Sequence, residues 1–230
     1  MLYKEWKPFY DEIKDYLDLN FEKDECAASL LDSILNGKLS QIKEIENLIK
    51  NKEVFIFGAG PSLEEKISIH KQKIRNAVNL VADGATSALL KNNIKPDIIV
   101  TDLDGHIPDQ KNANENGSIL VIHAHGDNID ALKKYVKDFR GHIVGTTQID
   151  PATFKNLYNF GGFTDGDRAV FIADHFDAKK IFLIGFDFKG EIGKYSFPEK
   201  KDKNIKLRKL KWCETLIKEI MEHNKNIEFL

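Results

Sequence analysis

Short, continuous apolar runs recur along this chain, and most of them are followed by a turn and a helical pattern. A run of this kind is typical of a strand buried on both faces of a parallel sheet, and the helix after it supplies the crossover to the next strand. The pattern predicts an α/β protein with a mostly parallel, Rossmann-like sheet of six or seven strands, covered by helices on both faces. The runs that we assign as strands lie at 54–57, 78–83, 97–100, 118–123, 141–145, 180–186 and 226–230.

Residues 1–51 contain no convincing strand and carry their apolar residues at helical spacing. We therefore expect two parts, an N-terminal helical annex over 1–51 and an α/β catalytic domain over 52–230. The annex could be a helical cover that packs on the main domain, or it could serve as a lid or a dimerisation element. One of its apolar faces consists of Trp6, Phe9, Tyr10, Ile13 and Leu17.

The charges favour a small-molecule function over nucleic-acid binding. The 34 basic and 36 acidic residues are interspersed and leave a net charge of -2, so no global basic field is present. Cys26 and Cys213 are far apart and lack a CxxC context, which indicates reduced thiols. The N-terminus has no apolar signal core, and no window approaches the roughly 20 apolar residues of a membrane span. We expect a cytoplasmic protein with neither nucleic acid nor membrane as a partner.

A glycine-rich turn, GAGPSL at 58–63, follows the first strand. Gly58 and Gly60 let backbone N–H groups approach an anion at a helix N-terminus, Pro61 suits the first helical turn, and Ser62 can donate its hydroxyl. The turn lacks the third glycine of the dinucleotide fingerprint and the Gly-Lys-Ser/Thr of a Walker A loop. It indicates a nucleotide or phosphate site. The alternative is a tight turn whose backbone conformation requires glycine and which binds no ligand.

Carboxylates end the next two strands. Asp83, with Gly84 after it, closes one, and Asp102 and Asp104 close the other. An extended backbone would point Asp102 and Asp104 to the same side. Like charges at that distance repel unless a cation lies between them, and hard oxygen ligands beside phosphate suit Mg²⁺. The alternative is a pair of cap or turn residues. The polar stretch that follows, to Gly117, is expected to be a loop on the substrate side.

Three further turns carry polar residues at predicted strand ends. His125 and Asp127 follow the strand 118–123, although Asp127 could instead be an N-cap. His123 is either a ligand contact or a buried core histidine. Asp187 follows the strand 180–186.

The glycine-rich turn before the helix at 164–176 holds Thr164, Asp165 and Arg168. Thr164 or Asp165 would cap this helix. An arginine in the first turn opposes the helix dipole, so we expect Arg168 to bind a phosphate or to pair with Asp165 or Asp167. Ligands of parallel sheets bind beyond the carboxyl ends of the strands, and all of these candidates fall there.

The segments 83–85 and 95–105 resemble thiamin pyrophosphokinases, whose carboxylates bind Mg²⁺ and the phosphates of ATP. The chain departs from that family at Thr101 and Gly105, where the family has Gly and Ser. Asp127 matches the next acidic motif of that family by position only, and the resemblance makes it a third metal carboxylate beside Asp102 and Asp104.

A larger part of the chain resembles the archaeal 6-hydroxymethyl-7,8-dihydropterin pyrophosphokinase (MptE-like) family. This resemblance implies ATP- and Mg²⁺-dependent transfer of diphosphate to the pterin hydroxymethyl group, with release of AMP, in tetrahydromethanopterin or folate biosynthesis. A homodimer is expected from related pyrophosphokinases. The five motifs that carry the resemblance lie at 58–63, 82–85, 101–105, 123–128 and 162–168.

On this reading Asp104, Asp127 and Arg168 are the catalytic candidates, and Asp187 or Asp165 would accept from the amino-pyrimidine edge of the pterin. Two other enzymes remain open: a thiamin pyrophosphokinase, and a nucleotide-sugar glycosyltransferase, since the GxGPSL turn also occurs in sialyltransferase-like proteins. A nucleotide-binding regulator is a third alternative. The residues expected to contact ATP or the acceptor are Gly58, Gly60, Pro61, Ser62, Asp83, Gly84, His125, Thr164, Asp165 and Asp187.

Overall fold

The computed structural model describes residues 1–37, 42–189, 192–197 and 202–230. Its strands form one sheet in which every neighbouring pair is parallel. They are β1 (Glu53–Phe57), β2 (Val78–Ala82), β3 (Ile98–Thr101), β4 (Ile119–Ala124), β5 (Ile143–Thr147), β6 (Leu157–Tyr158), β7 (Lys180–Ile184) and β8 (Ile227–Phe229). The predicted parallel α/β fold is confirmed.

The sheet has eight strands rather than six or seven, in the order β6-β5-β4-β3-β2-β1-β7-β8. The additional strand is β6, a two-residue edge strand that lies outside the runs assigned as strands. A strand of this length is too short to produce an alternating pattern. Its place in the sheet depends on pairing with β5, which a local reading of the sequence does not detect.

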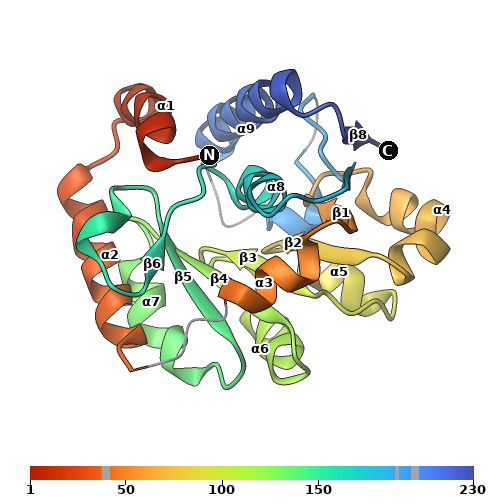
Figure 1. Ribbon diagram of the computed structural model, residues 1–230, viewed down its shortest axis with the longest axis horizontal. Coiled ribbons are helices and arrows are strands. Elements are labelled where there is room, and N and C mark those ends of the chain that lie inside the picture. Colours follow the sequence, from red (N-terminus) through yellow and green to blue (C-terminus); the bar gives the residue numbers. More distant parts are fainter. Residues whose placement is uncertain (38–41, 190–191, 198–201) are drawn as a thin grey trace.

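Helices cover both faces of the sheet (Figure 1). The α-helices of the described ranges are α1 (Tyr3–Leu17), α2 (Phe21–Leu35), α3 (Ile42–Ile49), α4 (Leu63–Arg75), α5 (Ala85–Lys91), α6 (Ile107–Glu115), α7 (Ile129–Tyr135), α8 (Asp165–His175) and α9 (Lys203–His223). Short 3-10 turns lie at Val136–Asp138, Pro151–Thr153 and Lys194–Ser196. In the view of Figure 1, α8 and α9 lie above the sheet, and α5 and α6 lie below it.

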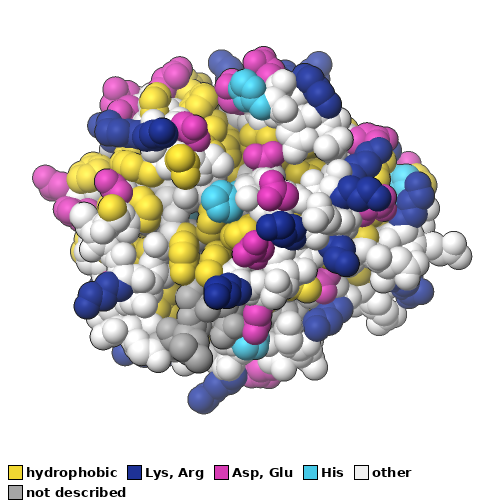
Figure 2. Space-filling model, in the orientation of Figure 1, with side chains coloured by type: hydrophobic (Ala, Val, Ile, Leu, Met, Phe, Trp, Pro, Cys, Tyr) yellow, Lys and Arg dark blue, Asp and Glu magenta, His cyan; other side chains and the backbone are white. Residues whose placement is uncertain are grey.

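The apolar runs are continuous because both faces of each central strand are covered. In β1, Val54 and Ile56 belong to the larger core, which also holds the apolar residues of α8. Phe55 and Phe57 point the other way and pack with the apolar residues of α4 and α5. Among the described residues no helix is long and apolar enough to cross a membrane. Figure 2 shows acidic and basic side chains interspersed over one face of the molecule.

The segment from Asp104 to Gly117 is not a loop, as its composition suggested, because most of it forms α6. Two of its four buried residues, Gln110 and Asn114, carry amides and stand beside Ile107 and Ala113, so the usual apolar helical pattern is weak. Gln110 donates to Asp83, and the amide of Asn114 donates to the carbonyls of Ser118 and His142 at 2.9 and 3.0 Å. These amides can be buried because each finds a hydrogen-bond partner.

The N-terminal helices share the core of the sheet. Trp6, Tyr10 and Ile13 of α1 are buried in the same cluster as strand residues, and α2 packs against β5 and β4. The indole N–H of Trp6 donates to the carbonyl of Gln148 at 2.8 Å. The boundary at residue 51 remains a prediction, but the apolar face of α2 packs on the main sheet, and α1 packs on α8 and α9.

The strand order reverses at β1, since β2 to β6 extend to one side of it and β7 and β8 to the other. Ligands of open parallel sheets bind beside such a switch point, at the carboxyl ends of the strands. The turns after β1 and β7 touch there, because Gly60 N donates to the carbonyl of Gly185 at 2.9 Å. The fold therefore brings two of the predicted site motifs together.

Candidate active site

A cavity of about 390 Å³ lies where the turns after the strands meet. Two of the predicted site residues, Pro61 and Ser62, are not among those that line it. The predicted residues that do line it are Gly58, Gly60, Asp83, Gly84, Asp102, Asp104, His125, Asp127, Thr164, Asp165, Arg168 and Asp187.

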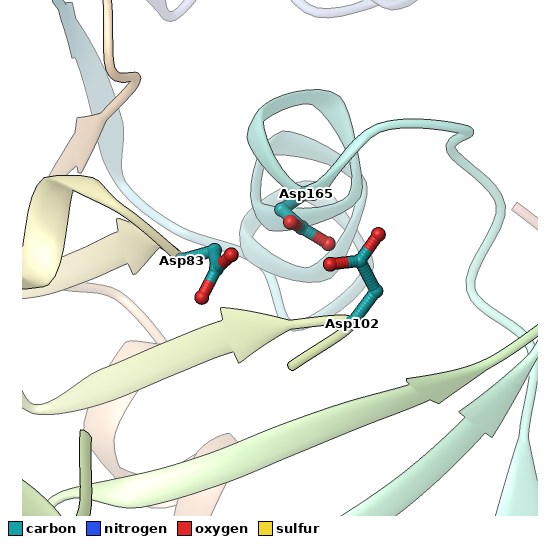
Figure 3. Close-up of side chains that lie close together, drawn as sticks. All are labelled: Asp83, Asp102 and Asp165. Atoms are coloured by element: carbon teal, nitrogen blue, oxygen red, sulfur yellow. The ribbon is translucent and has the colours of Figure 1, made fainter. Parts of the chain in front are cut away.

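Three carboxylates meet inside the cavity. Oxygen atoms of Asp83, Asp102 and Asp165 all lie within 4.8 Å of one another, and Figure 3 shows the three side chains pointing toward one another. Asp83 follows β2, Asp102 follows β3, and Asp165 begins α8. Three converging carboxylate oxygens are a suitable donor set for Mg²⁺.

The predicted metal set was Asp102, Asp104 and Asp127, which shares only Asp102 with this cluster. Asp104 and Asp127 are exposed and line the same cavity. Their roles as metal ligands stay predictions.

Asp83 is the buried member of the cluster. Its Oδ1 accepts a hydrogen bond from the Thr101 hydroxyl at 3.0 Å and another from Gln110. Burial raises the pKa of Asp83 well above its usual range, and the hydrogen bond and charge of Asp104, followed by the charges of Asp165 and Asp102, raise it further. A divalent cation among these groups would offset the repulsion, so the residues fit a metal.

The backbone between Asp102 and Asp104 is not extended, as we had assumed. Leu103 has a φ of 68°, and β3 already ends at Thr101. The hydroxyl of Thr101 explains the turn, because it accepts from Leu103 N at 2.8 Å. Asp102 consequently joins the carboxylate cluster, whereas Asp104 is exposed and approaches Asp83 from outside it.

Arg168 lies buried in the first turn of α8. Its predicted pairing with Asp165 is present, with Nη1 at 3.4 Å from Oδ1, and Nη2 approaches Gln148 Oε1 at 3.5 Å. Asp167 has another task, because it accepts from Thr164 N at 2.8 Å in a capping box in which Thr164 is the N-cap. Burial lowers the pKa of Arg168 while the nearby carboxylates oppose that shift, and a guanidinium stays charged in proteins.

His125 orients Asp102. Its Nδ1 accepts from Asp127 N at 3.3 Å, so its Nε2 carries the proton and donates to Asp102 Oδ2 at 3.2 Å. Asn128, not Asp127, occupies the N-cap position of α7, and its amide donates to the carbonyl of Asp102 at 2.9 Å.

His123 matches the core alternative. It is buried, and its Nδ1 lies 3.1 Å from the hydroxyl of Thr146, which itself donates to the carbonyl of Ile122. Nδ1 must therefore carry the proton. Burial, and then the charge of Arg168, lower the pKa of His123 well below its usual value, so the ring is neutral near pH 7.

A carboxylate occupies the start of α4. Asp187 Oδ2 accepts from the backbone N of Ser62 at 2.9 Å and from its hydroxyl at 2.8 Å. A Cβ on Gly60 would lie 2.2 Å from the same oxygen, so glycine is required for this approach. The negative charge at this helix start disfavours a phosphate there and suits a ligand that donates hydrogen bonds.

This geometry accompanies a clear family match. The family model described as "6-hydroxymethylpterin diphosphokinase MptE-like" matches residues 28–192. The chain belongs to this family. The match begins within α2 and ends beyond β7, so it contains every predicted site residue.

Relatives named 6-hydroxymethyl-7,8-dihydropterin pyrophosphokinase match this MptE-like chain over almost its whole length. The protein from Methanocaldococcus jannaschii is 44% identical, over 99% of this chain and 98% of the relative. That from Pyrococcus furiosus is 43% identical, over 100% and 99%. A solved structure, the MAf glycosyltransferase from Magnetospirillum magneticum AMB-1, is similar with a TM-score of 0.50 at 18% identity, over 75% of this chain and 29% of its own. That likeness concerns the fold alone.

The cavity of this MptE-like protein also has walls that the motif analysis missed. Asp24 of α2 is one of them. The sequence did contain an indication of it, because this acidic residue lies at helical spacing with the apolar residues Ala27, Ala28 and Leu31 and so shares their buried face.

Aromatic residues also line the cavity: Phe163 lies inside the motif at 162–168, Phe186 and Phe188 flank Asp187, and Tyr195 lies beyond the motifs. The missed lining residues with charged, amide or aromatic side chains include Lys23, Asp24, Gln148, Phe163, Phe186, Phe188, Tyr195, Phe197, Lys206, Arg208 and Lys209.

Proposed function

We propose that this protein transfers diphosphate from ATP to the hydroxymethyl group of 6-hydroxymethyl-7,8-dihydropterin and releases AMP. The relatives at 44% and 43% identity carry the name of this activity. The observation that carries the proposal is the buried Arg168 beside the cluster of Asp83, Asp102 and Asp165 in one cavity. A polyphosphate substrate requires positive charge around it, and the guanidinium of Arg168 and Mg²⁺ bound by the carboxylate cluster would supply it.

In the proposed reaction the acceptor oxygen forms a bond to the β-phosphorus of ATP. The bond from that phosphorus to the oxygen bridging it to the α-phosphate breaks, AMP leaves with that oxygen, and the hydroxyl proton is released. Catalysis of this kind depends on positioning and charge neutralisation. Bound Mg²⁺, held by Asp83, Asp102 and Asp165, would neutralise charge on the phosphates.

Arg168 would stabilise the negative charge that the transferred group carries. It suits this role because Gln148 and Asp165 hold its guanidinium on two sides, and its Nε has no hydrogen-bond partner within the described part of the chain. Asp104, next to Asp83, and Asp127, on the turn with His125, complete the proposed catalytic set.

We assign the pterin to the end of the cavity at Asp187. The amino-pyrimidine edge of a pterin donates hydrogen bonds, and a carboxylate accepts them without the repulsion that a phosphate would meet. Phe186 and Phe188 flank Asp187 in sequence and line the cavity beside it. Their rings offer apolar faces to a flat heterocycle. The assignment favours Asp187 over Asp165, since Asp165 already belongs to the carboxylate cluster proposed to hold Mg²⁺.

The proposal places the reaction in the cytoplasm, in the biosynthesis of tetrahydromethanopterin or folate. Its partners are the pterin and ATP, with no nucleic acid, and the active form is a homodimer. Analytical ultracentrifugation of the purified chain tests the last point directly.

The decisive experiment measures AMP release from ATP and Mg²⁺ with 6-hydroxymethyl-7,8-dihydropterin, with thiamin and with no acceptor. We expect AMP only with the pterin. AMP release with thiamin would support the diphosphoryl transfer but assign thiamin as the acceptor. If the folded protein releases no AMP with either acceptor, the proposal is contradicted. Asp104→Ala serves as the active-site control and is expected to abolish turnover.

A further inference from the structure

One buried carboxylate of the N-terminal helices lies at the active site. Asp24 lies on α2, is 3% exposed and lines the cavity. It precedes residues 28–192, the part that the family model matches. A buried carboxylate needs hydrogen-bond donors around it, and those of Asp24 come from three separate segments.

Each oxygen of Asp24 has an assigned partner. Oδ1 accepts from Gly126 N at 2.7 Å. Oδ2 accepts from the hydroxyl of Tyr10 at 2.7 Å and from Gln148 Nε2 at 2.6 Å. Tyr10 belongs to the annex, but Gly126 and Gln148 belong to turns at the carboxyl edge of the sheet.

The contact with Gly126 positions the turn that carries His125 and Asp127. A Cβ at Gly126 would lie 2.6 Å from Lys23 Cβ and 3.3 Å from Asp24 Oδ1, so the turn packs directly on α2. His125 in turn donates to Asp102 of the carboxylate cluster. A displacement of this turn would therefore reach the proposed metal site.

The contact with Gln148 determines how Arg168 is held. The amide nitrogen of Gln148 donates to Asp24, which leaves its carbonyl oxygen facing Arg168 Nη2 at 3.5 Å. If the amide turned around, its N–H groups would face the guanidinium. The charge of Asp24 thus selects the one orientation of Gln148 that accepts from Arg168.

We propose that Asp24 is a positioning residue for the diphosphoryl transfer, an inference that rests on the proposed function. Through Gly126 it sets the His125 turn, and through Gln148 it sets Arg168. The N-terminal helices then do more than cover the sheet, because they also help to position the catalytic residues.

The test compares Asp24→Asn with Asp32→Asn in the full-length protein. An asparagine has one acceptor oxygen, so at least one of the donors loses its partner. We expect kcat for AMP release to fall by about 10²-fold, the loss typical of a displacement of about 1 Å, with KM for ATP nearly unchanged. Asp32 is the matched control, because it lies on the same helix and accepts from Lys155 N and Asn156 N, away from the cavity. Its variant should keep the wild-type kcat.

Hydrogen exchange gives a readout that does not depend on turnover. Peptides covering 124–129 and 166–169 should exchange faster in Asp24→Asn than in Asp32→Asn. If Asp24→Asn fails to fold, Gly126→Ala tests the same contact from the other side and should reproduce the loss of kcat. Wild-type kcat and unchanged exchange in the variants would overturn the inference. If the wild type itself releases no AMP, the proposed function fails, and exchange still decides whether Asp24 holds the turn.

Discussion

The hydroxyl of Thr101 donates a hydrogen bond to Asp83 Oδ1 at 3.0 Å and links the end of β3 to the end of β2. The same hydroxyl oxygen accepts from Leu103 N at 2.8 Å. One side chain therefore holds a buried carboxylate and also bends the backbone that presents Asp102. Thiamin pyrophosphokinases have glycine at this position, so this arrangement is a feature in which the present chain differs from them.

Thr101→Val removes both hydrogen bonds and keeps the shape of the side chain. Leu103 N is left without this partner at a cost of about 1–3 kcal/mol, and of its two donors Asp83 Oδ1 keeps only Gln110, so we expect a lower free energy of unfolding in urea together with reduced AMP release. Thr86→Val is the control, because Thr86 is buried and its hydroxyl has no partner among the residues described. It should be nearly neutral. Equal stability of the two variants would contradict the role of Thr101.

Asp187→Asn tests the pterin end of the cavity. Loss of a charged acceptor weakens binding by about 1.5–3 kcal/mol, which is about 10- to 150-fold in affinity. We expect KM for the pterin to rise accordingly while KM for ATP stays close to its wild-type value. Ser62→Ala, which removes one hydrogen bond to Asp187 and leaves the carboxylate, should have a smaller effect. A rise confined to KM for ATP would instead assign this end to the nucleotide.

Metal binding distinguishes the cluster in the structure from the set predicted from the sequence. Asp102 belongs to both, so Asp102→Asn should abolish Mg²⁺-dependent turnover. Asp165→Asn should raise the Mg²⁺ concentration for half-maximal activity by at least about 10-fold, since even losses outside the ligand shell cost about 10- to 100-fold in metal affinity. Mn²⁺ binding followed by electron paramagnetic resonance, with a non-hydrolysable ATP analogue, supplies the second readout. A loss of Mn²⁺ binding in Asp127→Asn but not in Asp165→Asn would support the sequence-based set.

His123 should make the protein less stable as the solution becomes acidic. Because its pKa is lowered in the folded state, the unfolded chain alone takes up this proton below about pH 6.5. The free energy of unfolding then falls as pH drops, by up to about 1.4 kcal/mol per pH unit from this group.

The measurement is urea unfolding between pH 7.5 and 5.5 for the wild type and His123→Asn. The asparagine amide can still donate to Thr146 but does not titrate in this range. We expect a shallower pH dependence in the variant, whatever its absolute stability. Identical slopes would show that the imidazole does not remain neutral in the folded protein.

Much of this architecture could be predicted from local patterns. Strands such as β1 and β7 are continuous apolar runs because a parallel sheet is covered on both faces. The polar residues after successive strands could be assigned to one edge because parallel strands end on the same side. α6 was not predicted because its buried face includes Gln110 and Asn114, whose amides donate to groups outside the helix.

The sequence by itself determined the fold class and the edge of the sheet at which the chemistry lies, because periodicity and strand direction are properties of neighbouring residues. Only the tertiary structure decided which carboxylates meet, since that depends on the turn at Leu103 and on the approach of α8. The same holds for Asp24 and Gly126, which are 102 positions apart along the chain and 2.7 Å apart in the fold. A contact of this kind leaves no local pattern, because it exists only after the helices have packed on the sheet.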